Sequence, residues 1–160
     1  MTIYFGYEKK QVIQALRYHF LSRPEIKMLL ILINVFAIGS AVLFALGKVQ
    51  PIAFLAFSLL WFILMLAIWT LLPRNIYKKA RTFQDKFSLT FGPDDVMLFT
   101  ERGSQSWPWD GFSTYLESPF FFHLYFNPRS FFLVPKDAFE DLTDLQQTRD
   151  LIKEKIPRGK

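Results

Sequence analysis

Two long apolar stretches decide the fold: residues 28–46 read MLLILINVFAIGSAVLFAL and residues 52–72 read IAFLAFSLLWFILMLAIWTLL. Neither stretch contains a charged side chain. At about 1.5 Å per residue, either stretch spans roughly 30 Å as an α-helix, which is the thickness of the hydrocarbon core of a bilayer. Helices buried in a soluble domain would keep a polar face, which these stretches lack. A cleaved signal peptide is also excluded, because the segment that precedes the first apolar stretch is too long for one. The sequence therefore predicts two transmembrane helices.

The connection between the two stretches is very short, with Lys48, Val49, Gln50 and Pro51 between them. The helices must therefore be antiparallel neighbours, which predicts a helical hairpin. Lys and Arg number ten on the outer flanks, residues 1–27 and 73–86, against Lys48 alone in the turn. By the positive-inside rule both termini are cytoplasmic and the turn lies outside. We expect a multi-pass protein of the inner (cytoplasmic) membrane.

Small and polar side chains within the first stretch suggest how the hairpin packs. Ala37, Ala41 and Ala45 recur at every fourth position, a spacing that lets a second helix approach closely, so we expect this stripe to face the second helix. Asn34 is the only amide in either stretch. Without an acid or base nearby, it is interpreted as a structural hydrogen-bonding group rather than a transport site.

The N-terminal flank, residues 1–27, predicts a strand followed by an amphipathic helix. Residues 2–5 alternate polar and apolar side chains, as a strand does. Residues 8–21 place apolar side chains at helical spacing, which predicts a helix near the headgroups or against the domain. Ser22 with Glu25 three residues later has the capping-box pattern, which predicts where the first membrane helix begins.

The net charge of +5 belongs to the flanks of the membrane segments. Lys and Arg outnumber acids five to two in residues 1–27 and five to one in residues 73–86, whereas residues 87–160 carry eight against eleven. A domain with a net negative charge binds the negatively charged phosphate backbone of a nucleic acid poorly, so we expect no nucleic-acid partner. The chain has no cysteine, which excludes disulfides, thiol nucleophiles and Cys-ligated metals.

After residue 81 the sequence changes to short alternating runs separated by turn residues, which predicts strands. The six predicted strands are residues 83–91, 96–100, 104–109, 112–117, 120–126 and 131–134. Thr143 and Gln146 form a second capping-box pattern ahead of a final helix, which Pro157 ends.

Six short antiparallel strands followed by one helix are typical of a strongly bent sheet or open barrel closed at one end, the outline of a pleckstrin-homology-like domain. With the strand at residues 2–5 the domain would have seven strands. The transmembrane hairpin would then be inserted between the first and second strands of one fold. The sequence thus predicts an α+β membrane protein in three parts. A strand and helix occupy residues 1–27, a transmembrane hairpin residues 28–72, and a cytoplasmic, antiparallel β-barrel-like domain residues 83–156.

Three motifs resemble those of the YcxB-like family of bacterial membrane proteins. They are Trp109 with Phe112 three positions later, the aromatic run Phe122-His123-Leu124-Tyr125-Phe126, and the run Val134-Pro135-Lys136-Asp137-Ala138-Phe139. The resemblance implies two transmembrane helices and a domain of this type, and it implies no reaction. Position 112 departs from the aliphatic residue usual in the family. From residue type alone, we expect Trp109 and Phe112 in the core and Pro135 at the end of the last strand.

The sequence offers no catalytic or metal-binding pattern. His19 and His123 are the only histidines, and neither has a second ligand at suitable spacing. No phosphate-binding loop, nucleophile elbow or paired-carboxylate spacing is present. We therefore predict a protein that is not an enzyme and that needs no cofactor.

The aromatic run around residue 122 is apolar on both faces of its strand. Its second face either packs against the N-terminal helix or the membrane surface, which is the preferred interpretation, or forms an exposed patch for a partner. The hypothetical partner-binding patch consists of Tyr115, Phe121, His123 and Tyr125, on the face opposite Phe112, Leu116, Phe122 and Leu124.

These observations predict a noncatalytic scaffold or interaction protein that is anchored in the lipid bilayer and binds a protein or lipid partner. The alternative is an immunity or resistance protein that neutralises a toxin acting at the same membrane. Small size and the lack of catalytic motifs fit both functions. The sequence leaves homo-oligomerisation open.

Overall fold

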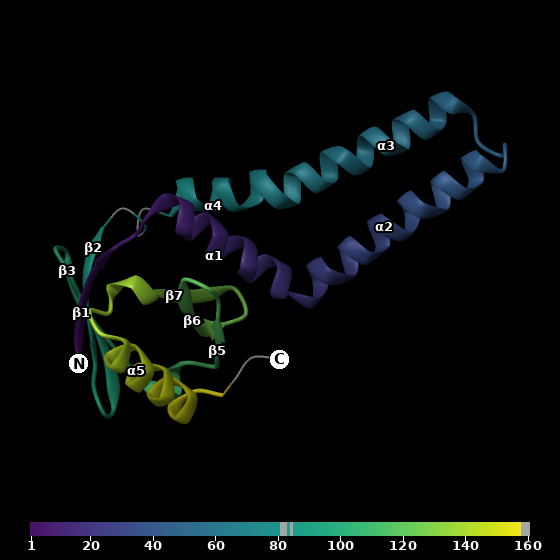
Figure 1. The fold of residues 1–160 in the computed structure, drawn as a ribbon. Coiled ribbons are helices and arrows are strands. Elements are labelled where there is room, and N and C mark those ends of the chain that lie inside the picture. The colour runs from purple at the N-terminus through teal and green to yellow at the C-terminus, as the bar shows by residue number, and fades with distance from the viewer. Residues whose placement is uncertain (81–82, 84, 158–160) are drawn as a thin grey trace. The chain divides into compact units, whose positions relative to one another are not determined.

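The computed structural model describes residues 1–80, 83 and 85–157 (Figure 1). The chain divides into two compact units. We call residues 1–15 with 81–160 the sheet unit, and residues 16–80 the hairpin unit. Helix α1 (Lys9–Ser22) begins in the first and ends in the second.

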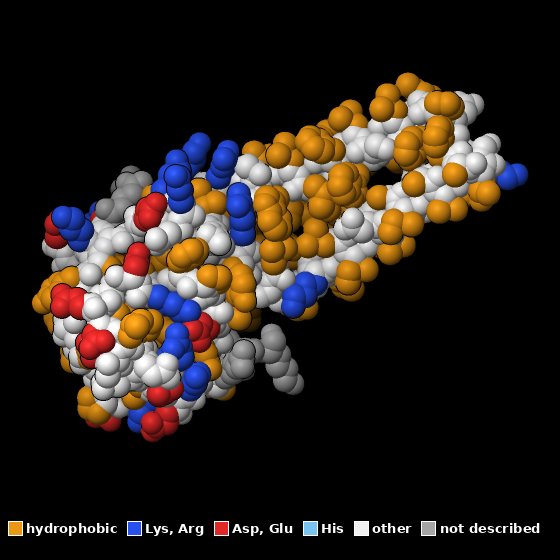
Figure 2. Space-filling view, viewed as in Figure 1, with side chains coloured by type: hydrophobic (Ala, Val, Ile, Leu, Met, Phe, Trp, Pro, Cys, Tyr) orange, Lys and Arg blue, Asp and Glu red, His pale blue; other side chains and the backbone are white. Residues whose placement is uncertain are grey.

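The hairpin unit contains the two predicted apolar helices. Its elements are α2 (Pro24–Ala45), α3 (Pro51–Leu66), the π-helix η1 (Ala67–Leu71) and α4 (Leu72–Lys79). The continuous helical segments Pro24–Ala45 and Pro51–Lys79 are both long and apolar enough to cross a membrane. Figure 2 shows hydrophobic side chains exposed along them. The structure therefore contains two candidate membrane-spanning helices where the sequence predicted them.

The turn of the hairpin follows from Gly47. This glycine has a φ of 67°, a left-handed conformation that L side chains rarely adopt. Gly47 N donates to Phe44 O at 2.9 Å and Lys48 N donates to Leu43 O at 2.9 Å, which is the Schellman pattern that ends a helix. Across the turn the rings of Phe44 and Phe54 stack with centroids 4.5 Å apart. Backbone geometry and aromatic packing together hold the two helices antiparallel.

The π-helix η1 ends at Leu71, two residues before Pro73. Proline has no N–H to donate to the carbonyl four residues earlier, here that of Trp69, and its ring clashes with a regular helix at that point. The freed Trp69 carbonyl instead accepts a hydrogen bond from Arg17 Nε at 2.9 Å. The Arg17 guanidinium also lies 5.6 Å from the centroid of the Trp69 ring. Within the hairpin unit, α1 is thus tied to the end of the second apolar segment.

Two sequence predictions about the hairpin need correction, the alanine stripe and the capping box. Ala45 is exposed, so only part of the alanine stripe lies at the helix interface; Ala37 and Ser40 are half-buried there. Asn34 Nδ2 donates to Leu30 O of its own helix at 2.7 Å, which agrees with its interpretation as a structural hydrogen-bonding group. The predicted capping box is absent, because the N-cap of α2 is Arg23, without a side-chain bond, and Ser22 Oγ donates to His19 O.

The sheet unit consists of two antiparallel sheets. The first has the strand order β1-β2-β3-β4 and the second β5-β6-β7. The strands are β1 (Thr2–Gly6), β2 (Lys86–Phe91), β3 (Asp95–Thr100), β4 (Gly103–Pro108), β5 (Thr114–Glu117), β6 (Phe121–Asn127) and β7 (Ser130–Pro135). The 3₁₀ turns η3 (Trp109–Gly111) and η4 (Lys136–Ala138) and the helix α5 (Leu142–Lys155) also belong to this unit. Among the described residues the strands form an α+β unit of two separate sheets and no closed barrel.

Most predicted strands agree with the structure, and the disagreements have local causes. The strand predicted at residues 83–91 begins only at Lys86, and its position 84 lies outside the described residues. Helix α5 is capped by Asp141, whose side chain accepts from Thr143 N, so Thr143 is not the predicted cap. Aspartate is among the residues preferred at the N-cap, because its carboxylate accepts a hydrogen bond from a backbone N–H of the first helical turn. This explains why α5 begins earlier than predicted.

The N-terminal strand β1 is an integral part of the first sheet. It pairs with β2, in a register that places Thr2 opposite Thr90 and Phe5 opposite Phe87. At its start Phe91 N donates to Met1 O at 2.8 Å, and the Thr2 and Thr90 hydroxyls lie 2.8 Å apart. The hairpin unit is therefore an insertion between two adjacent strands of one sheet.

An aromatic-rich core holds the sheet unit together. It gathers side chains from both sheets and from α5. Its buried members are Ile3, Phe5, Phe87, Leu89, Phe91, Val96, Leu98, Trp109, Phe112, Tyr115, Phe122, Leu124, Phe132, Val134, Ile152 and Ile156. In β1 to β3 these side chains occupy every second position, so the alternate positions turn away from the core.

Candidate functional site

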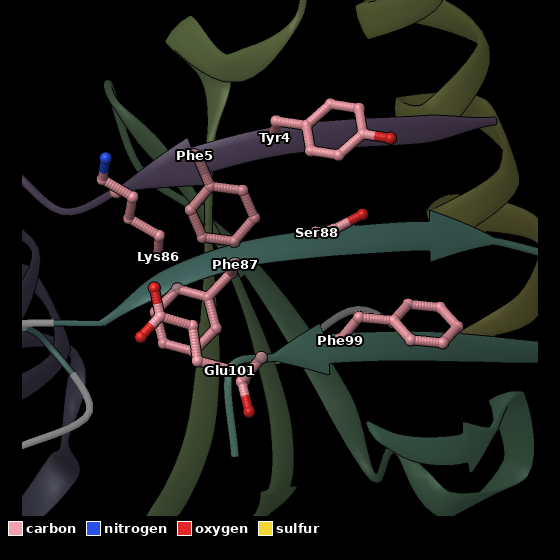
Figure 3. Close-up of a pocket in the computed structure, with 9 residues that line it drawn as sticks. Tyr4, Phe5, Lys86, Phe87, Ser88, Phe99 and Glu101 are labelled. Carbon is pink, nitrogen blue, oxygen red and sulfur yellow. The ribbon is translucent and has the colours of Figure 1, made fainter. Parts of the chain in front are cut away.

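The outer face of the first sheet, which turns away from the core, carries two exposed aromatic rings. Tyr4 of β1 lies opposite Ser88 of β2, which in turn lies opposite Phe99 of β3. Tyr4 is 76% and Phe99 is 44% exposed. Because residues directly opposite each other share a face, the three side chains form one row in which the small serine separates two rings (Figure 3). We call this row and its surroundings the outer groove.

The outer groove has a volume of about 570 Å³. The residues that line it are Tyr4, Phe5, Gly6, Lys86, Phe87, Ser88, Phe99, Thr100 and Glu101. Beside it, Arg102 forms an ion pair with Asp85 at 3.2 Å. The rim therefore carries both signs of charge around an aromatic centre. An amphipathic surface of this kind suits a partner that offers apolar groups flanked by polar ones.

The patch that the sequence predicted lies elsewhere and is buried. Tyr115, Phe121, His123 and Tyr125 are 6%, 1%, 0% and 7% exposed. His123 Nε2 lies 3.0 Å from Ser118 Oγ, which also donates to Phe121 O. These side chains are therefore part of the interior, and the structure contradicts their use as an exposed patch.

The four residues also do not share one face. Tyr115 lies opposite Leu124 and belongs to the core, whereas Leu116 lies opposite His123. The prediction counted the alternation from Phe112, but β5 begins only at Thr114, and Phe112 and Ser113, which follow the 3₁₀ turn η3, belong to no strand. Because the period of a strand is two, this offset exchanges the faces of every following residue in β5.

The N-terminal segment helps to cover the second face of the β5-β6-β7 sheet. The ring of Tyr7 lies 6.3 Å from that of Phe121, and its hydroxyl donates to Leu133 O at 2.6 Å. Burial raises the pKa of Tyr7, so its hydroxyl stays protonated. Val12 and Ala15, in the part of α1 that belongs to the sheet unit, are also buried. The preferred interpretation of this face, packing within the chain, agrees with these contacts.

Four of the five motif residues hold the core in place. Trp109 Nε1 donates to Gly92 O at 3.1 Å, and its ring stacks on that of Phe91. Phe112 and Pro135 are buried, and the ring of Phe139 stacks on that of Phe91 with centroids 6.4 Å apart. Their role in this structure is packing.

The fifth motif residue, Lys136, belongs to a half-buried ion cluster. Lys136 Nζ lies 2.7 Å and Arg149 Nε 3.1 Å from Glu117 Oε1. Both cations also lie over the ring of Phe122, at 5.1 Å and 5.9 Å from its centroid. Burial alone would raise the pKa of the Glu117 carboxyl, but the hydrogen bonds and charges of the two cations outweigh it, so the pKa is lowered. The cluster joins β5, the turn after β7 and α5.

A comparison with protein-family models matches residues 91–152 to the family described as YcxB-like protein. The C-terminal region is YcxB-like. The match confirms the resemblance inferred from the motifs, all of which lie inside the matched region. Neither the curated proteins nor the solved structures that were searched contain a match to the chain.

The outer groove lies partly outside the YcxB-like region. Phe99 and Glu101 are within residues 91–152, whereas Tyr4 and Ser88 are not. The groove therefore depends on the N-terminal strand as well as on the matched YcxB-like segment. Sequence reasoning missed it because the pairing of β1 with β2 joins positions far apart along the chain. One signal was present: Tyr4 and Phe99 are aromatic at positions out of phase with the core residues of their own strands.

The hairpin unit has two further features of the kind found at binding sites, apolar spaces between its helices and a buried histidine. Apolar spaces of about 610 Å³ and 550 Å³ lie between the helices, and both are lined by Ala37, Ser40, Phe57 and Trp61. His19 is buried, and burial together with the nearby charge of Arg23 lowers its pKa to about 4, so it is neutral at pH 7. Among the described residues no cluster of three or more His, Asp or Glu side chains could hold a metal ion.

Proposed function

We propose that the protein is a noncatalytic, membrane-anchored interaction protein whose sheet unit binds a protein partner through the outer groove. The hairpin unit anchors it in the inner membrane, with both termini in the cytoplasm. The sheet unit acts there as a pleckstrin-homology-like domain. The partner is a protein that inserts apolar side chains between Tyr4 and Phe99.

The membrane anchor and its orientation rest on two observations. The helical segments Pro24–Ala45 and Pro51–Lys79 have the length and composition of membrane spans, and their apolar side chains are exposed rather than packed in a core. Lys and Arg gather on the flanks of the hairpin, whereas the turn has only Lys48. This distribution favours cytoplasmic flanks.

The pleckstrin-homology-like assignment is supported by the order of the elements. Four antiparallel strands form one sheet, the next three form a second, and α5 follows the last strand. Ile152 and Ile156 bring that helix into the core shared by both sheets. A bent antiparallel sheet closed by a C-terminal helix is the layer arrangement that the sequence predicts for this fold.

The exposed aromatic pair carries the binding proposal. A ring exposed on an otherwise polar sheet face gains free energy when a partner removes it from water, at about 25 cal/mol per Å² of apolar surface. Tyrosine and phenylalanine are enriched among residues that dominate interfaces. The rim favours a protein over an anionic lipid headgroup, because Glu101 lies beside Lys86 and Arg102 is already paired with Asp85.

Site-specific photo-crosslinking in native membranes tests this function. A photoreactive phenylalanine placed at Tyr4 or at Phe99 should crosslink to the same protein, identified by mass spectrometry. Leu142, which is 80% exposed on α5, is the matched control because it is a large apolar side chain away from the groove. Equal labelling from position 142, or different proteins from the two groove positions, would contradict the proposal.

The immunity function stays the alternative prediction. Protection against one membrane-active toxin, retained after Tyr4 and Phe99 are both changed to Ser, would favour it over binding through the outer groove.

A further inference from the structure

Strand β4 is an open edge of the first sheet. It is the last strand in the order β1-β2-β3-β4, and its residues are exposed except for the half-buried Trp107. The other three sheet edges each meet another part of the chain. β1 lies beside η4, Tyr115 N of β5 donates to Pro157 O, and Leu133 O of β7 accepts from Tyr7. No comparable contact to the outer edge of β4 occurs within residues 1–80, 83 and 85–157.

The hydrogen-bond phase of the sheet identifies the free groups on this edge. Trp109 N donates to Asp94 O, which makes positions 94 and 109 a hydrogen-bonded pair of the β3-β4 ladder. Such pairs alternate along antiparallel strands, so Gly103, Gln105 and Trp107 bond to β3. Ser104 and Ser106 therefore direct their N–H and C=O groups away from the sheet.

The edge lacks the features that usually prevent strand pairing. Natural edges are protected by charged side chains, by proline or by bulges. From Gly103 to Trp107 the strand has no charge and no proline, and its register with β3 is continuous. Proline appears only at its end, as Pro108.

We propose that β4 pairs antiparallel with β4 of a second copy of this chain, about a two-fold axis at Gln105, to form one continuous eight-stranded sheet. In this register Ser104 lies opposite Ser106 of the second copy, so both N–H groups and both C=O groups of each strand are used. A shift by two residues toward the β3-β4 turn would require Arg102 N, which already donates to Thr100 Oγ1 at 3.2 Å. A shift the other way would require Pro108, which has no N–H.

The side chains at the ends of the strand complement each other in the same register. Trp107, the bulkiest residue of β4, lies opposite Gly103 of the second copy, where nothing lies within 4 Å of an added Cβ. A two-fold axis makes the interface self-complementary, which is why we assign a second copy rather than an unrelated peptide.

The pairing extends the surface that holds the outer groove. Ser104 continues the row that contains Tyr4, Ser88 and Phe99, and in the dimer this row continues into Ser106 of the second copy. The two outer grooves then lie on one face of a single sheet. The inference is independent of what the groove binds, because it rests on backbone groups of a different strand.

Disulfide crosslinking tests the register, because the chain has no native cysteine. Gln105→Cys places two thiols on the two-fold axis in a non-hydrogen-bonded pair, with Cα atoms about 4.5 Å apart, within the range of a disulfide. Mild oxidation of the full chain in membranes should therefore give a covalent dimer. Ser104→Cys is the matched control: its two copies are offset, with Cα atoms roughly 7–8 Å apart, and should crosslink far less.

A second change separates specific pairing from random collision. Ser106→Pro removes an N–H that points away from β3, so the sheet is retained while the pairing loses hydrogen bonds. In the Gln105→Cys chain it should reduce the dimer to the level of the Ser104→Cys control. Native mass spectrometry of the cysteine-free chain in detergent should show a shift from dimer to monomer on the same Ser106→Pro change. Equal crosslinking at positions 104 and 105, or a dimer that is unaffected by Ser106→Pro, would overturn the proposal.

Discussion

The two sheets of the sheet unit both carry aromatic side chains on the face that turns away from their shared core, but the surroundings of these faces differ. Around β6, Phe121, His123 and Tyr125 are buried, and Tyr7 packs against Phe121. On the first sheet, Tyr4 and Phe99 remain exposed. Alternation along a strand thus identifies two faces, whereas the cover supplied by other elements decides which face can meet a partner.

The largest effect that separates the two faces is expected from truncating Phe121. Phe121→Ala removes a ring that is 1% exposed and should lower the free energy of unfolding of the sheet unit by about 3–5 kcal/mol. The matched change Phe99→Ala, on the exposed face, should alter it by less than about 0.5 kcal/mol. Thermal unfolding in detergent, followed by tryptophan fluorescence, measures both. Similar losses for the two variants would mean that the outer face is also covered.

A smaller effect is expected at the contact that helps to cover the β6 face. Tyr7→Phe keeps the ring against Phe121 but removes the hydroxyl that donates to Leu133 O, and it should destabilise the sheet unit by about 1–2 kcal/mol. Tyr4→Phe, which removes an exposed hydroxyl, is the control. Thermal unfolding in detergent compares the two variants. An unchanged free energy of unfolding for Tyr7→Phe would show that the hydrogen bond does not fix the N-terminal segment.

The ion cluster of Glu117 predicts a pH dependence. Because its pKa is lowered in the folded state, Glu117 contributes stability above its unfolded pKa of about 4.3, and this contribution is lost as the pH falls through the folded pKa. Glu117→Gln should therefore cost about 1 kcal/mol at pH 7 and almost nothing in strong acid. Unfolding curves of both proteins between neutral pH and acid check this. A difference that does not shrink on acidification would assign the effect to packing instead.

The smallest effect is expected at the outer groove itself. Tyr4→Ser with Phe99→Ser removes both exposed rings and should change the free energy of unfolding by less than about 1 kcal/mol, because neither ring fills a cavity. Circular dichroism and the unfolding midpoint measure this. A loss comparable to that of Phe121→Ala would break the distinction between a binding face and a core face.

The sequence predicted the local elements better than their surroundings. The apolar stretches and the alternation of most strands were visible because each is encoded by consecutive residues. The sheet face predicted for Tyr115 was wrong because the alternation was counted across the 3₁₀ turn Trp109–Gly111. The strand β5, and with it the true alternation, begins only after that turn. The caps at Ser22 and Thr143 were wrong because Arg23 and Asp141, one and two residues away, take the position.

The candidate site could not be predicted for a different reason. Tyr4 and Phe99 come together only because β1 and β3 both pair with β2, across more than 80 residues that include the hairpin unit. Part of the cover of the buried side chains around His123 comes from Tyr7, which lies in another part of the chain. Neither the pairing of distant strands nor the cover of a sheet face is encoded in a local pattern.

The most direct test of the account is co-purification of the partner from native membranes with the wild-type chain, the Tyr4→Ser/Phe99→Ser variant and a Leu142→Ser control. The partner is the protein crosslinked from both groove positions, and the three chains are compared at equal amounts of folded, membrane-inserted protein. The account predicts that the groove variant loses the partner while the control retains it. Full retention by the groove variant would contradict binding through the outer groove.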